Sequence, residues 1–465
     1  MRVWETLFVL LQLPVWLRLV WRRRVWRGAD PLIPVVWLAV AAAVSVLHVL
    51  LEGWRWQTVP AWGLFAWGLW LAVQQWRRRF QAQAGLFRRR LGAGGVLLRM
   101  VSGLVLLVLL ALPWLLPVPR LEPVTGPYPV GTRLYRWTDT SRENLPDRGQ
   151  ADKGRHVLVQ LWYPSSAADG GKGEAPYVPG PMLRQLNRAL RETVGLPGFV
   201  TDYLKLARTD VREESLPAAD GKRYPVVVFY HGWPGFGFTY HYLMTGLASR
   251  GYVVASIDIG WAEHRSQAPN ELDLPAWDRW IDDIWAPDQR FVLDKLAELN
   301  RADPEGIWTG RLDLERAAAA GHSFGGDAAL AALGQDRRFR AAVSLDGAFY
   351  GRSGVRKSPE QRVLRLATAE TAQQPDLPRR SGAQLQAAGV AAEQYAGWVK
   401  AFAERMQRIE GGQPPLVLRV SSHSSFSDVY LFSPLLRLRD RGPDPYRIHT
   451  QTVEAVDRFL AEALR

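Results

Sequence analysis

The six residues 321–326, Gly-His-Ser-Phe-Gly-Gly, decide the fold that this chain is predicted to adopt. A run of Ala and Gly, residues 317–321, comes directly before the serine, and a helical pattern of small residues, 327–333, follows. This order predicts a strand, a tight turn and a helix, with Ser323 at the apex of the turn. Glycine is needed two residues before and two residues after Ser323, because side chains there would clash with the crossing strand and helix. The motif therefore indicates a nucleophilic serine, followed by a helix whose N-terminus directs N–H groups at a developing oxyanion.

Apolar segments of strand length recur along the chain on both sides of this motif. They are residues 156–163, 225–230, 252–257, 317–321, 341–345 and 415–421. Helical patterns separate them, and the clearest of these covers residues 288–299. Alternating strands and helices predict an α/β fold with a mainly parallel sheet and helices on both faces.

The predicted catalytic domain covers residues 151–465. Residues 119–150, which precede it, are rich in Pro, Gly and polar side chains, and this composition predicts a linker. Residues 351–413 form a long insertion before the last strand. Apolar side chains recur at helical spacing near its end, and we expect a docked helix there rather than a lid that touches lipid. The side chains of this stripe are Tyr395, Val399, Phe402, Met406 and Ile409.

Four apolar runs come before the linker, at residues 4–21, 32–51, 59–76 and 94–118. The last three are long enough to cross a ~30 Å hydrocarbon layer as helices, and Trp residues lie towards their ends, as at a membrane interface. The first run is shorter and contains Pro14 and Arg18, and we favour a span over an interfacial helix or a signal-like segment. Residues 1–118 are therefore predicted to be an anchor of three to four transmembrane helices, rather than buried core helices of a soluble protein.

The positive charge of the chain is concentrated in this anchor region. The formal net charge is +13, and residues 1–120 hold 15 Arg but only 3 acidic residues. The arginines cluster between the first and second apolar runs and between the third and fourth, and such clusters stay on the cytoplasmic side. The pattern predicts that the catalytic domain lies on the extracytoplasmic side of the cell membrane. It argues against nucleic-acid binding, because these arginines do not form a basic face on a folded domain.

The chain has no cysteine, which excludes disulfides, thiolate nucleophiles and Cys-based zinc sites. We also predict that the chain uses no cofactor and no metal ion. No pattern in the sequence predicts an oligomeric state.

A serine hydroxyl needs a base that removes its proton, and this base is nearly always a histidine held in one tautomer. His423 directly follows the strand segment 415–421, and in an open α/β sheet the active groups gather beyond the carboxyl ends of strands. His264 is the alternative base. His322 is next to the nucleophile, and we expect its side chain to point away because the turn is sharp.

The acid that orients the histidine is expected just beyond another strand. Asp346 follows the segment 341–345, where a carboxylate costs free energy unless it is paired, and the N–H of His423 would pair it. Asp258 has a similar position and is the alternative acid. The oxyanion needs two N–H donors. We predict the backbone N–H of Phe324, and that of Trp233 in the His-Gly-Trp loop after the strand 225–230.

These features together resemble the platelet-activating factor acetylhydrolase (isoform II type) family of α/β-hydrolases. The resemblance rests on the motif at 321–326, the His-Gly loop, Asp346 at 23 residues after Ser323, and the stretch His-Ser-Ser-Phe-Ser-Asp at 423–428. The segments 157–164 and 290–296 are also similar. The resemblance covers roughly residues 120–465, whereas the best-known members of the family lack four N-terminal spans.

The resemblance implies the α/β-hydrolase fold and a calcium-independent esterase that acts on the sn-2 ester of phospholipids with short or oxidised acyl chains. It implies Ser323 as nucleophile, His423 as base and Asp346 as orienting acid. Residues 347–350, Gly-Ala-Phe-Tyr, depart from the family pattern, and we expect them to line the acyl pocket. We therefore interpret the chain as a membrane-anchored serine esterase for a lipid or small ester. The alternatives are a general carboxylesterase or dienelactone-hydrolase-like enzyme on soluble esters, and a membrane scaffold or transporter with an inactive hydrolase domain.

Overall fold

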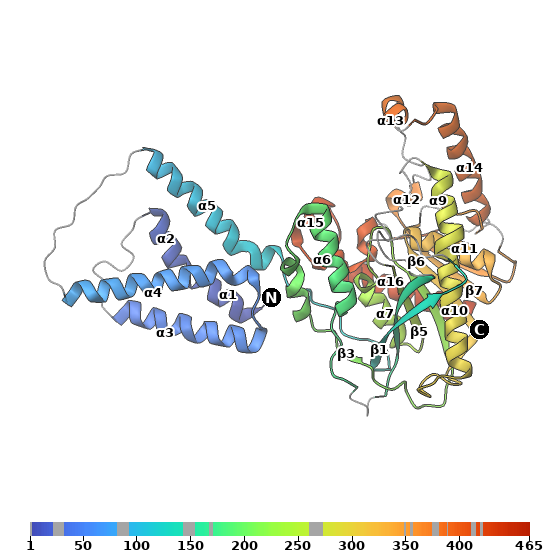
Figure 1. Cartoon of the computed structure of the whole chain (residues 1–465), viewed down its shortest axis with the longest axis horizontal. Coiled ribbons are helices and arrows are strands. Elements are labelled where there is room, and N and C mark those ends of the chain that lie inside the picture. The colour runs from blue at the N-terminus through green and yellow to red at the C-terminus, as the bar shows by residue number, and fades with distance from the viewer. Residues whose placement is uncertain are drawn as a thin grey trace. The chain divides into compact units, whose positions relative to one another are not determined.

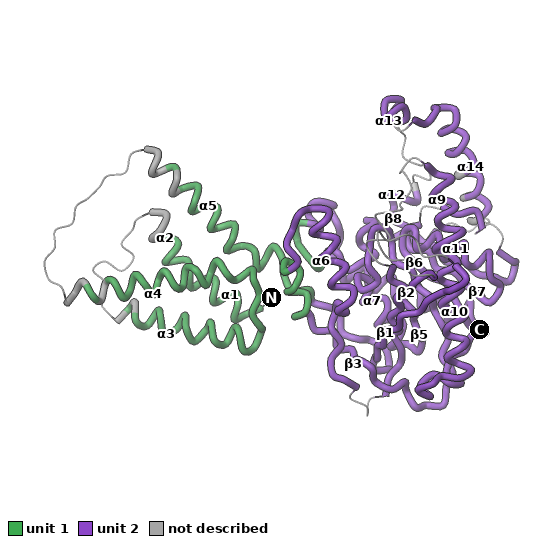
Figure 2. The backbone as a smooth tube through the Cα atoms, in the orientation of Figure 1, with its two compact units in different colours: residues 1–119, 199–206, 431–435 green, residues 120–198, 207–430, 436–465 purple. Residues whose placement is uncertain are grey.

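The structure is a computed structural model, and its chain divides into two compact units (Figure 2). Unit 1 comprises residues 1–119, 199–206 and 431–435, and unit 2 comprises residues 120–198, 207–430 and 436–465. The structure describes residues 2–21, 32–80, 93–142, 154–166, 171–259, 273–347, 350–353, 357–373, 381–387, 389–410, 415–418 and 422–465.

Unit 2 is built on a nine-stranded sheet with the order β3-β1-β2-β5-β4-β6-β7-β8-β9. The strands are β1 (Val130–Asp139), β2 (Arg155–Pro164), β3 (Val211–Glu213), β4 (Tyr224–Tyr230), β5 (Val253–Asp258), β6 (Leu312–His322), β7 (Phe339–Leu345), β8 (Arg362–Thr368) and β9 (Leu416–Leu418). From β5 to β9 every neighbouring pair is parallel, and β2 pairs antiparallel with both β1 and β5. The predicted α/β fold with a mainly parallel sheet is confirmed, and the sheet is mixed at the β1–β2 end.

Helices cover both faces of this sheet, as Figure 1 shows. On one face, α10 (Ala286–Arg301) and α11 (Phe324–Gln335) pack with α9 (Leu274–Trp280) and the π-helix η5 (Ile281–Trp285). On the other face, α7 (His241–Ala248) and α16 (Pro445–Ala463) pack against the same strands. The central strands are buried on both faces, which explains why they read in the sequence as continuous apolar runs rather than as alternating patterns.

The remaining helices of unit 2 are short or lie at the periphery. They are α6 (Gly180–Val194), η4 (Gly237–Tyr240), α12 (Ala369–Gln373), α13 (Gly382–Ala387), α14 (Ala392–Glu410) and η7 (His423–Phe426), with most of η8 (Asp428–Leu431) and α15 (Pro434–Arg439). The 3₁₀ segment η3 (Gly198–Leu206) follows α6, and its residues 199–206 belong to unit 1. The chain breaks between α6 and η3 because Gly195 adopts a left-handed conformation and ends α6, shortly before Pro197.

Two strands lie in segments for which the sequence analysis predicted a linker or an insertion. β1 occupies residues 130–139 of the predicted linker 119–150, where Pro and Gly next to the strand hide its alternation of buried and exposed residues. β8 lies within the predicted insertion 351–413 and separates β7 from β9. The insertion is therefore partly a strand of the sheet, because residues 362–368 pair in parallel with β7.

The end of the insertion forms helix α14, and two of its predicted apolar residues dock on the core of unit 2. Tyr395 is buried and Val399 is partly buried against the same core cluster. The side chains of Phe402, Met406 and Ile409 lie outside the described part of the structure. Arg405 also ties α14 to α9, because its Nη1 donates to Asp278 Oδ1 at 2.6 Å.

Unit 1 is helical. It contains α1 (Val3–Leu10), α2 (Leu13–Trp21), α3 (Leu32–Leu47), the π-helical turn η1 (His48–Glu52), η2 (Trp56–Thr58), α4 (Val59–Phe80) and α5 (Ala93–Leu115). The first apolar run is two helices rather than one, because a turn at residues 11–12 separates α1 from α2. The helices share a small core that includes Phe8, Val15, Leu64 and Leu110.

One helix among the described residues is long and apolar enough to cross a membrane, Val35–Glu52, with a mean hydropathy of 2.2. Two further helices, Val3–Leu17 and Met100–Leu115, are apolar but shorter. Helix α4 is long but carries Trp and Gln, which lower its hydropathy. The predicted bundle of three to four transmembrane helices is therefore not confirmed, and one candidate span stands. The arginine clusters that orient the predicted anchor lie largely in residues 22–31 and 81–92, outside the described residues.

Candidate active site

The nucleophile motif folds as a strand, a turn and a helix, with Ser323 between β6 and α11. A Cβ atom on Gly321 would overlap the backbone oxygen of Gly325, and one on Gly325 would overlap the backbone oxygen of Tyr230. Glycine at both positions is required because the backbone segments touch, as the motif predicts. Ser323 itself has φ of 54° and ψ of −125°, a strained conformation for a residue with a side chain.

Asp346 and His423 meet at the carboxyl end of the sheet. Asp346 follows β7, and its backbone N–H donates to Leu366 O of β8 at 2.7 Å. One carboxylate oxygen, Oδ1, accepts the N–H of Thr368 at 2.8 Å, and the other, Oδ2, lies 2.7 Å from His423 Nδ1. The Asp346 side chain is fully buried, whereas that of His423 is 54% exposed, so the pair joins the protein interior to solvent.

The surroundings of Asp346 keep it ionised. Burial alone would raise its pKa, but the hydrogen bond and charge of His423 and the Thr368 N–H outweigh burial and lower the pKa below its usual value. A carboxylate that faces Nδ1 makes that nitrogen the N–H donor, which leaves the lone pair on Nε2. The histidine is thus held in the tautomer that a general base requires.

The loop after β4 passes directly beside Ser323. A Cβ atom on Gly232 would lie 3.2 Å from Ser323 Cβ, so the backbone that leads into Trp233 runs along the nucleophile. Phe324 is the first residue of α11, where a backbone N–H has no acceptor within its own helix. Both predicted oxyanion donors, the N–H groups of Trp233 and Phe324, therefore belong to segments that border Ser323.

The competing residues of the sequence analysis have other partners or lie outside the described residues. Asp258 ends β5 and accepts the N–H of Gly237 at 2.9 Å. His264 lies in residues 260–272, which the structure does not describe. The histidine of the His-Gly-Trp loop, His231, was not an alternative; it is buried, its Nδ1 lies 2.9 Å from Gly232 O, and burial lowers its pKa to about 4.

His322 does not point away from the site, contrary to the expectation from the sharp turn. Its ring is buried, with its centroid 4.5 Å from that of His423, and its Nε2 lies 3.1 Å from the backbone oxygen of His423. On its other side, Nδ1 lies 2.8 Å from Tyr240 Oη. The sequence signal for this role was a histidine directly before the serine of the motif, but the sequence does not show in which direction that side chain points.

An aromatic wall borders the oxyanion segments, and the sequence analysis named only its Tyr350, as part of the acyl-pocket segment 347–350. Trp277 stacks on Phe324 at 4.5 Å between ring centroids, and Tyr350 contacts the same ring at 5.1 Å. Trp233 contacts Trp277 at 6.1 Å. The side chains of both proposed N–H donors thus meet one tryptophan. The Trp-rich stretch at residues 277–285 was a signal for this wall.

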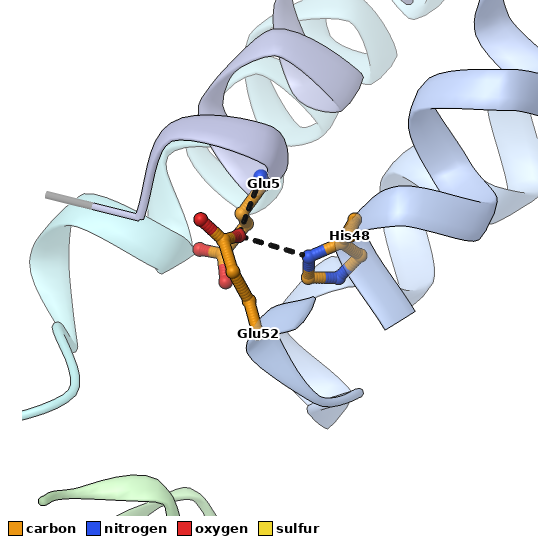
Figure 3. A group of neighbouring side chains, drawn as sticks. All are labelled: Glu5, His48 and Glu52. Carbon is orange, nitrogen blue, oxygen red and sulfur yellow. Dashed lines mark hydrogen bonds and ion pairs between the residues drawn. The ribbon is translucent and has the colours of Figure 1, made fainter. Parts of the chain in front are cut away.

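One group of side chains in the described residues has the spacing of a metal site, Glu5, His48 and Glu52 of unit 1 (Figure 3). His48 Nδ1 lies 3.3 Å from Glu52 Oε2, and Glu52 accepts the backbone N–H groups of Trp4 and Glu5. The carboxylate of Glu5 already pairs with two guanidinium groups, those of Arg2 and Arg55. Arg2 and Arg55 supply positive charge to Glu5 without a metal ion, and we interpret the group as an ion-pair cluster.

Arg55 also caps a helix in this ion-pair cluster. Its guanidinium donates to the backbone oxygens of Pro113 and Leu116 at the end of α5, while its other N–H groups face Glu5. Glu52 in turn caps the beginning of α1. The cluster therefore joins the start of α1 to the end of α5 through charged hydrogen bonds.

Comparison with known proteins supports the predicted relationship. The family model of platelet-activating factor acetylhydrolase, isoform II, matches residues 117–269 and 307–377. Ser323, Asp346 and Trp233 lie inside these segments, and His423 lies beyond them. The platelet-activating factor acetylhydrolase of Cavia porcellus is 27% identical over 225 residues, which cover 41% of this chain and 49% of the relative.

A second relative is the probable 1-alkyl-2-acetylglycerophosphocholine esterase of Arthroderma benhamiae. It is 24% identical over 274 residues, which cover 53% of this chain and 64% of the relative. The chain thus spans about half to two thirds of the length of the curated relatives it matches. The predicted resemblance to the acetylhydrolase family is confirmed at this modest identity.

Among solved structures, a ferulic acid esterase from Streptomyces cinnamoneus superposes with a TM-score of 0.52. The superposition covers 75% of this chain and 94% of the esterase chain, at 24% sequence identity. The superposed part of the chain therefore shares its fold with a solved esterase.

Proposed function

We propose that this chain, a relative of the platelet-activating factor acetylhydrolases of isoform II type, is a membrane-anchored serine esterase. The observation that carries the proposal is the buried carboxylate of Asp346, 2.7 Å from His423 Nδ1, beside a serine held at φ of 54°. A strained serine at the end of a strand and an oriented histidine together are the parts of a nucleophilic hydrolase site.

In the proposed reaction, Ser323 Oγ attacks the carbonyl carbon of an ester while His423 Nε2 takes the hydroxyl proton. The N–H groups of Phe324 and Trp233 stabilise the oxyanion that forms. The imidazolium, held by Asp346, then gives its proton to the departing alcohol and leaves an acyl group on Ser323. Water, deprotonated by His423, hydrolyses this acyl-enzyme and restores the hydroxyl.

The substrate that we favour is a phospholipid-derived ester with a short or oxidised acyl chain. The relatives carry names for enzymes that act on platelet-activating factor or on 1-alkyl-2-acetylglycerophosphocholine. The rings of Trp277, Phe324 and Tyr350 stand against the oxyanion segments, where they would limit the room beside the reacting carbonyl to a small acyl group. A soluble carboxylic ester is the alternative substrate class.

Membrane anchoring is part of the proposal. Large apolar side chains are exposed on α3 with η1 and on α5, although the helices have a shared core, and such surfaces on a soluble protein would be unfavourable. The exposed residues include Val35, Val36, Val40, Val46, Leu50, Leu51, Leu97, Leu104, Val105 and Val108. The arginine clusters of the sequence would then place unit 2 on the extracytoplasmic side.

The activity is tested with the purified full chain in detergent and a panel of nitrophenyl and phosphatidylcholine esters of increasing acyl length. We expect turnover that decreases as the acyl chain grows, and no turnover by Ser323→Ala. Full activity of Ser323→Ala would disprove the assignment of the nucleophile. A preference for long-chain or for soluble non-lipid esters would disprove the substrate class but not the mechanism.

The topology is tested with single cysteines, because the chain has none of its own. Glu462→Cys on the exposed face of α16 is expected to react with a membrane-impermeant maleimide in intact cells, and the exposed Arg77→Cys only after lysis. The reverse pattern would disprove the proposed orientation.

A further inference from the structure

His322 is the histidine of the nucleophile motif that the proposed reaction does not use, and it lies at the centre of a chain of hydrogen bonds. The backbone N–H of Gly232 donates to Tyr240 Oη at 3.1 Å. Tyr240 Oη lies 2.8 Å from His322 Nδ1, and His322 Nε2 lies 3.1 Å from the backbone oxygen of His423. Tyr240 and His322 are both buried.

The chemistry of these groups fixes the direction of every bond. A backbone oxygen can only accept, so the proton of the neutral His322 ring must be on Nε2, where it is donated to His423. Nδ1 then carries a lone pair and accepts the hydroxyl proton of Tyr240. The tyrosine oxygen, which has given its proton to His322, accepts the N–H of Gly232. Each donor in the chain therefore has one acceptor, and the ring orientation of His322 is determined.

The neutral state that this pattern requires agrees with the surroundings of His322. Burial lowers its pKa far below the usual value for histidine, and the neighbouring His423 lowers it further. Asp346 acts in the opposite direction but is outweighed. The ring keeps one donor and one acceptor throughout the range in which an esterase base works.

The chain of hydrogen bonds joins the three segments that carry the proposed site. Gly232 precedes Trp233, whose N–H is a proposed oxyanion donor, and His322 precedes Ser323. The acceptor at the far end is the backbone of the base itself, His423. Because the side chain of His423 is half exposed, the contact of the buried His322 ring with its backbone is a fixed point from which the imidazole reaches Asp346.

We infer that His322 is a positioning residue: with Tyr240, it sets the backbone of His423 relative to Ser323 and to the loop that holds Trp233. This inference rests on the proposed serine esterase function. His322 touches neither the substrate nor the reacting atoms in this role. It acts because small displacements of a catalytic group lower the rate of the chemical step strongly.

The test compares His322→Phe, which keeps a ring but removes both hydrogen bonds, with His322→Gln, which retains one donor and one acceptor. We expect His322→Phe to lower kcat on nitrophenyl acetate by about 10- to 100-fold with KM little changed, since only positioning is lost. His322→Gln is expected to recover at least a part of this loss. A fluorophosphonate should label Ser323 of His322→Phe more slowly by a similar factor.

Tyr240→Phe provides a second variant that leaves His322 in place, should His322→Phe fold poorly. It is expected to lower kcat in the same way, and its effect in the double variant with His322→Phe should be less than the product of the two single effects, because both act through one chain of bonds. Tyr163→Phe is the matched control, since Tyr163 Oη donates to Ser215 O, outside this chain, and its kcat should stay near that of the wild type.

The inference is overturned if Tyr240→Phe keeps the wild-type kcat, or if its loss is matched by Tyr163→Phe. It is also overturned if the two effects multiply fully in the double variant. Failure of the proposed function would differ from all of these results, because the wild type itself would then neither hydrolyse esters nor react at Ser323.

Discussion

The contact between Asp346 and His423 can be tested with Asp346→Asn, which replaces one carboxylate oxygen with an NH₂ group and leaves the shape of the side chain unchanged. In the structure, Oδ1 accepts the N–H of Thr368 and Oδ2 faces His423 Nδ1, so the carboxylate accepts at both ends. An amide has one accepting oxygen. If that oxygen keeps the Thr368 bond, the amide NH₂ faces Nδ1 and forces the proton of the imidazole onto Nε2, where no lone pair is left for the Ser323 proton.

The opposite orientation of the amide is disfavoured. It would place the NH₂ against the N–H of Thr368, in a buried position, and a buried donor without an acceptor costs about 1–3 kcal/mol. We therefore expect the wrong tautomer to dominate in Asp346→Asn. The comparable change in serine proteases lowers kcat about 10⁴-fold, which corresponds to about 5 kcal/mol of barrier height.

The assay is the kcat of nitrophenyl acetate hydrolysis near neutral pH, together with the thermal midpoint to establish that the variant is folded. Asp258→Asn is the matched control, because Asp258 also ends a strand and is buried but accepts from Gly237, a bond that an amide oxygen can keep. We expect less than a tenfold loss in the control. A loss below tenfold in Asp346→Asn, with a large loss in Asp258→Asn, would refute the reasoning and point to Asp258 as the acid.

Three further predictions concern other parts of the chain. Burial raises the pKa of Asp428 to about 7, so the folded state holds this proton more tightly than the unfolded chain, and the free energy of unfolding falls as pH rises from about 4 to 7. Asp428→Asn should remove this fall. Relative to wild type, the variant should gain up to about 3 kcal/mol in free energy of unfolding between about pH 5 and pH 8, measured by unfolding in detergent. Trp277→Ala removes the ring stacked on Phe324, and the ratio of kcat/KM for octanoyl over acetyl esters should rise about tenfold. Arg55→Met leaves Glu5 buried without its ion pair to Arg55 and should destabilise unit 1 by about 3–5 kcal/mol in thermal unfolding. An unchanged thermal midpoint would show that the ion-pair cluster adds no stability.

The central sheet could be predicted from the sequence because its strands are short apolar runs separated by helical patterns. The segment 225–230 became β4 and the segment 341–345 became part of β7, since residues buried on both faces leave little ambiguity. β1 was missed because its side chains alternate between partly buried and exposed only over residues 133–137, and because it follows a stretch rich in Pro and Gly. β8 was missed because it lies between long polar segments that read as one insertion.

The site could be predicted only to the level of its motif residues. Ser323 and Asp346 follow strands directly, and strand order then brings their backbones to one edge of the sheet. The position of His322 depends on backbone torsions at the turn, and the aromatic wall depends on how α9 packs, so neither follows from local sequence. The prediction of membrane spans is limited in the same way. Trp and Gln lower the hydropathy of α4, and the part of its surface that is exposed depends on how the neighbouring helices pack.

The central claim is that His423 activates Ser323, and the rate of covalent labelling by a fluorophosphonate measures this most directly. After labelling of the full chain, peptide mass spectrometry should find the adduct on Ser323 alone, and His423→Gln should slow its formation at least about 10²-fold while the protein stays folded. Equal labelling rates in the wild type and His423→Gln, or an adduct on another serine, would contradict the account.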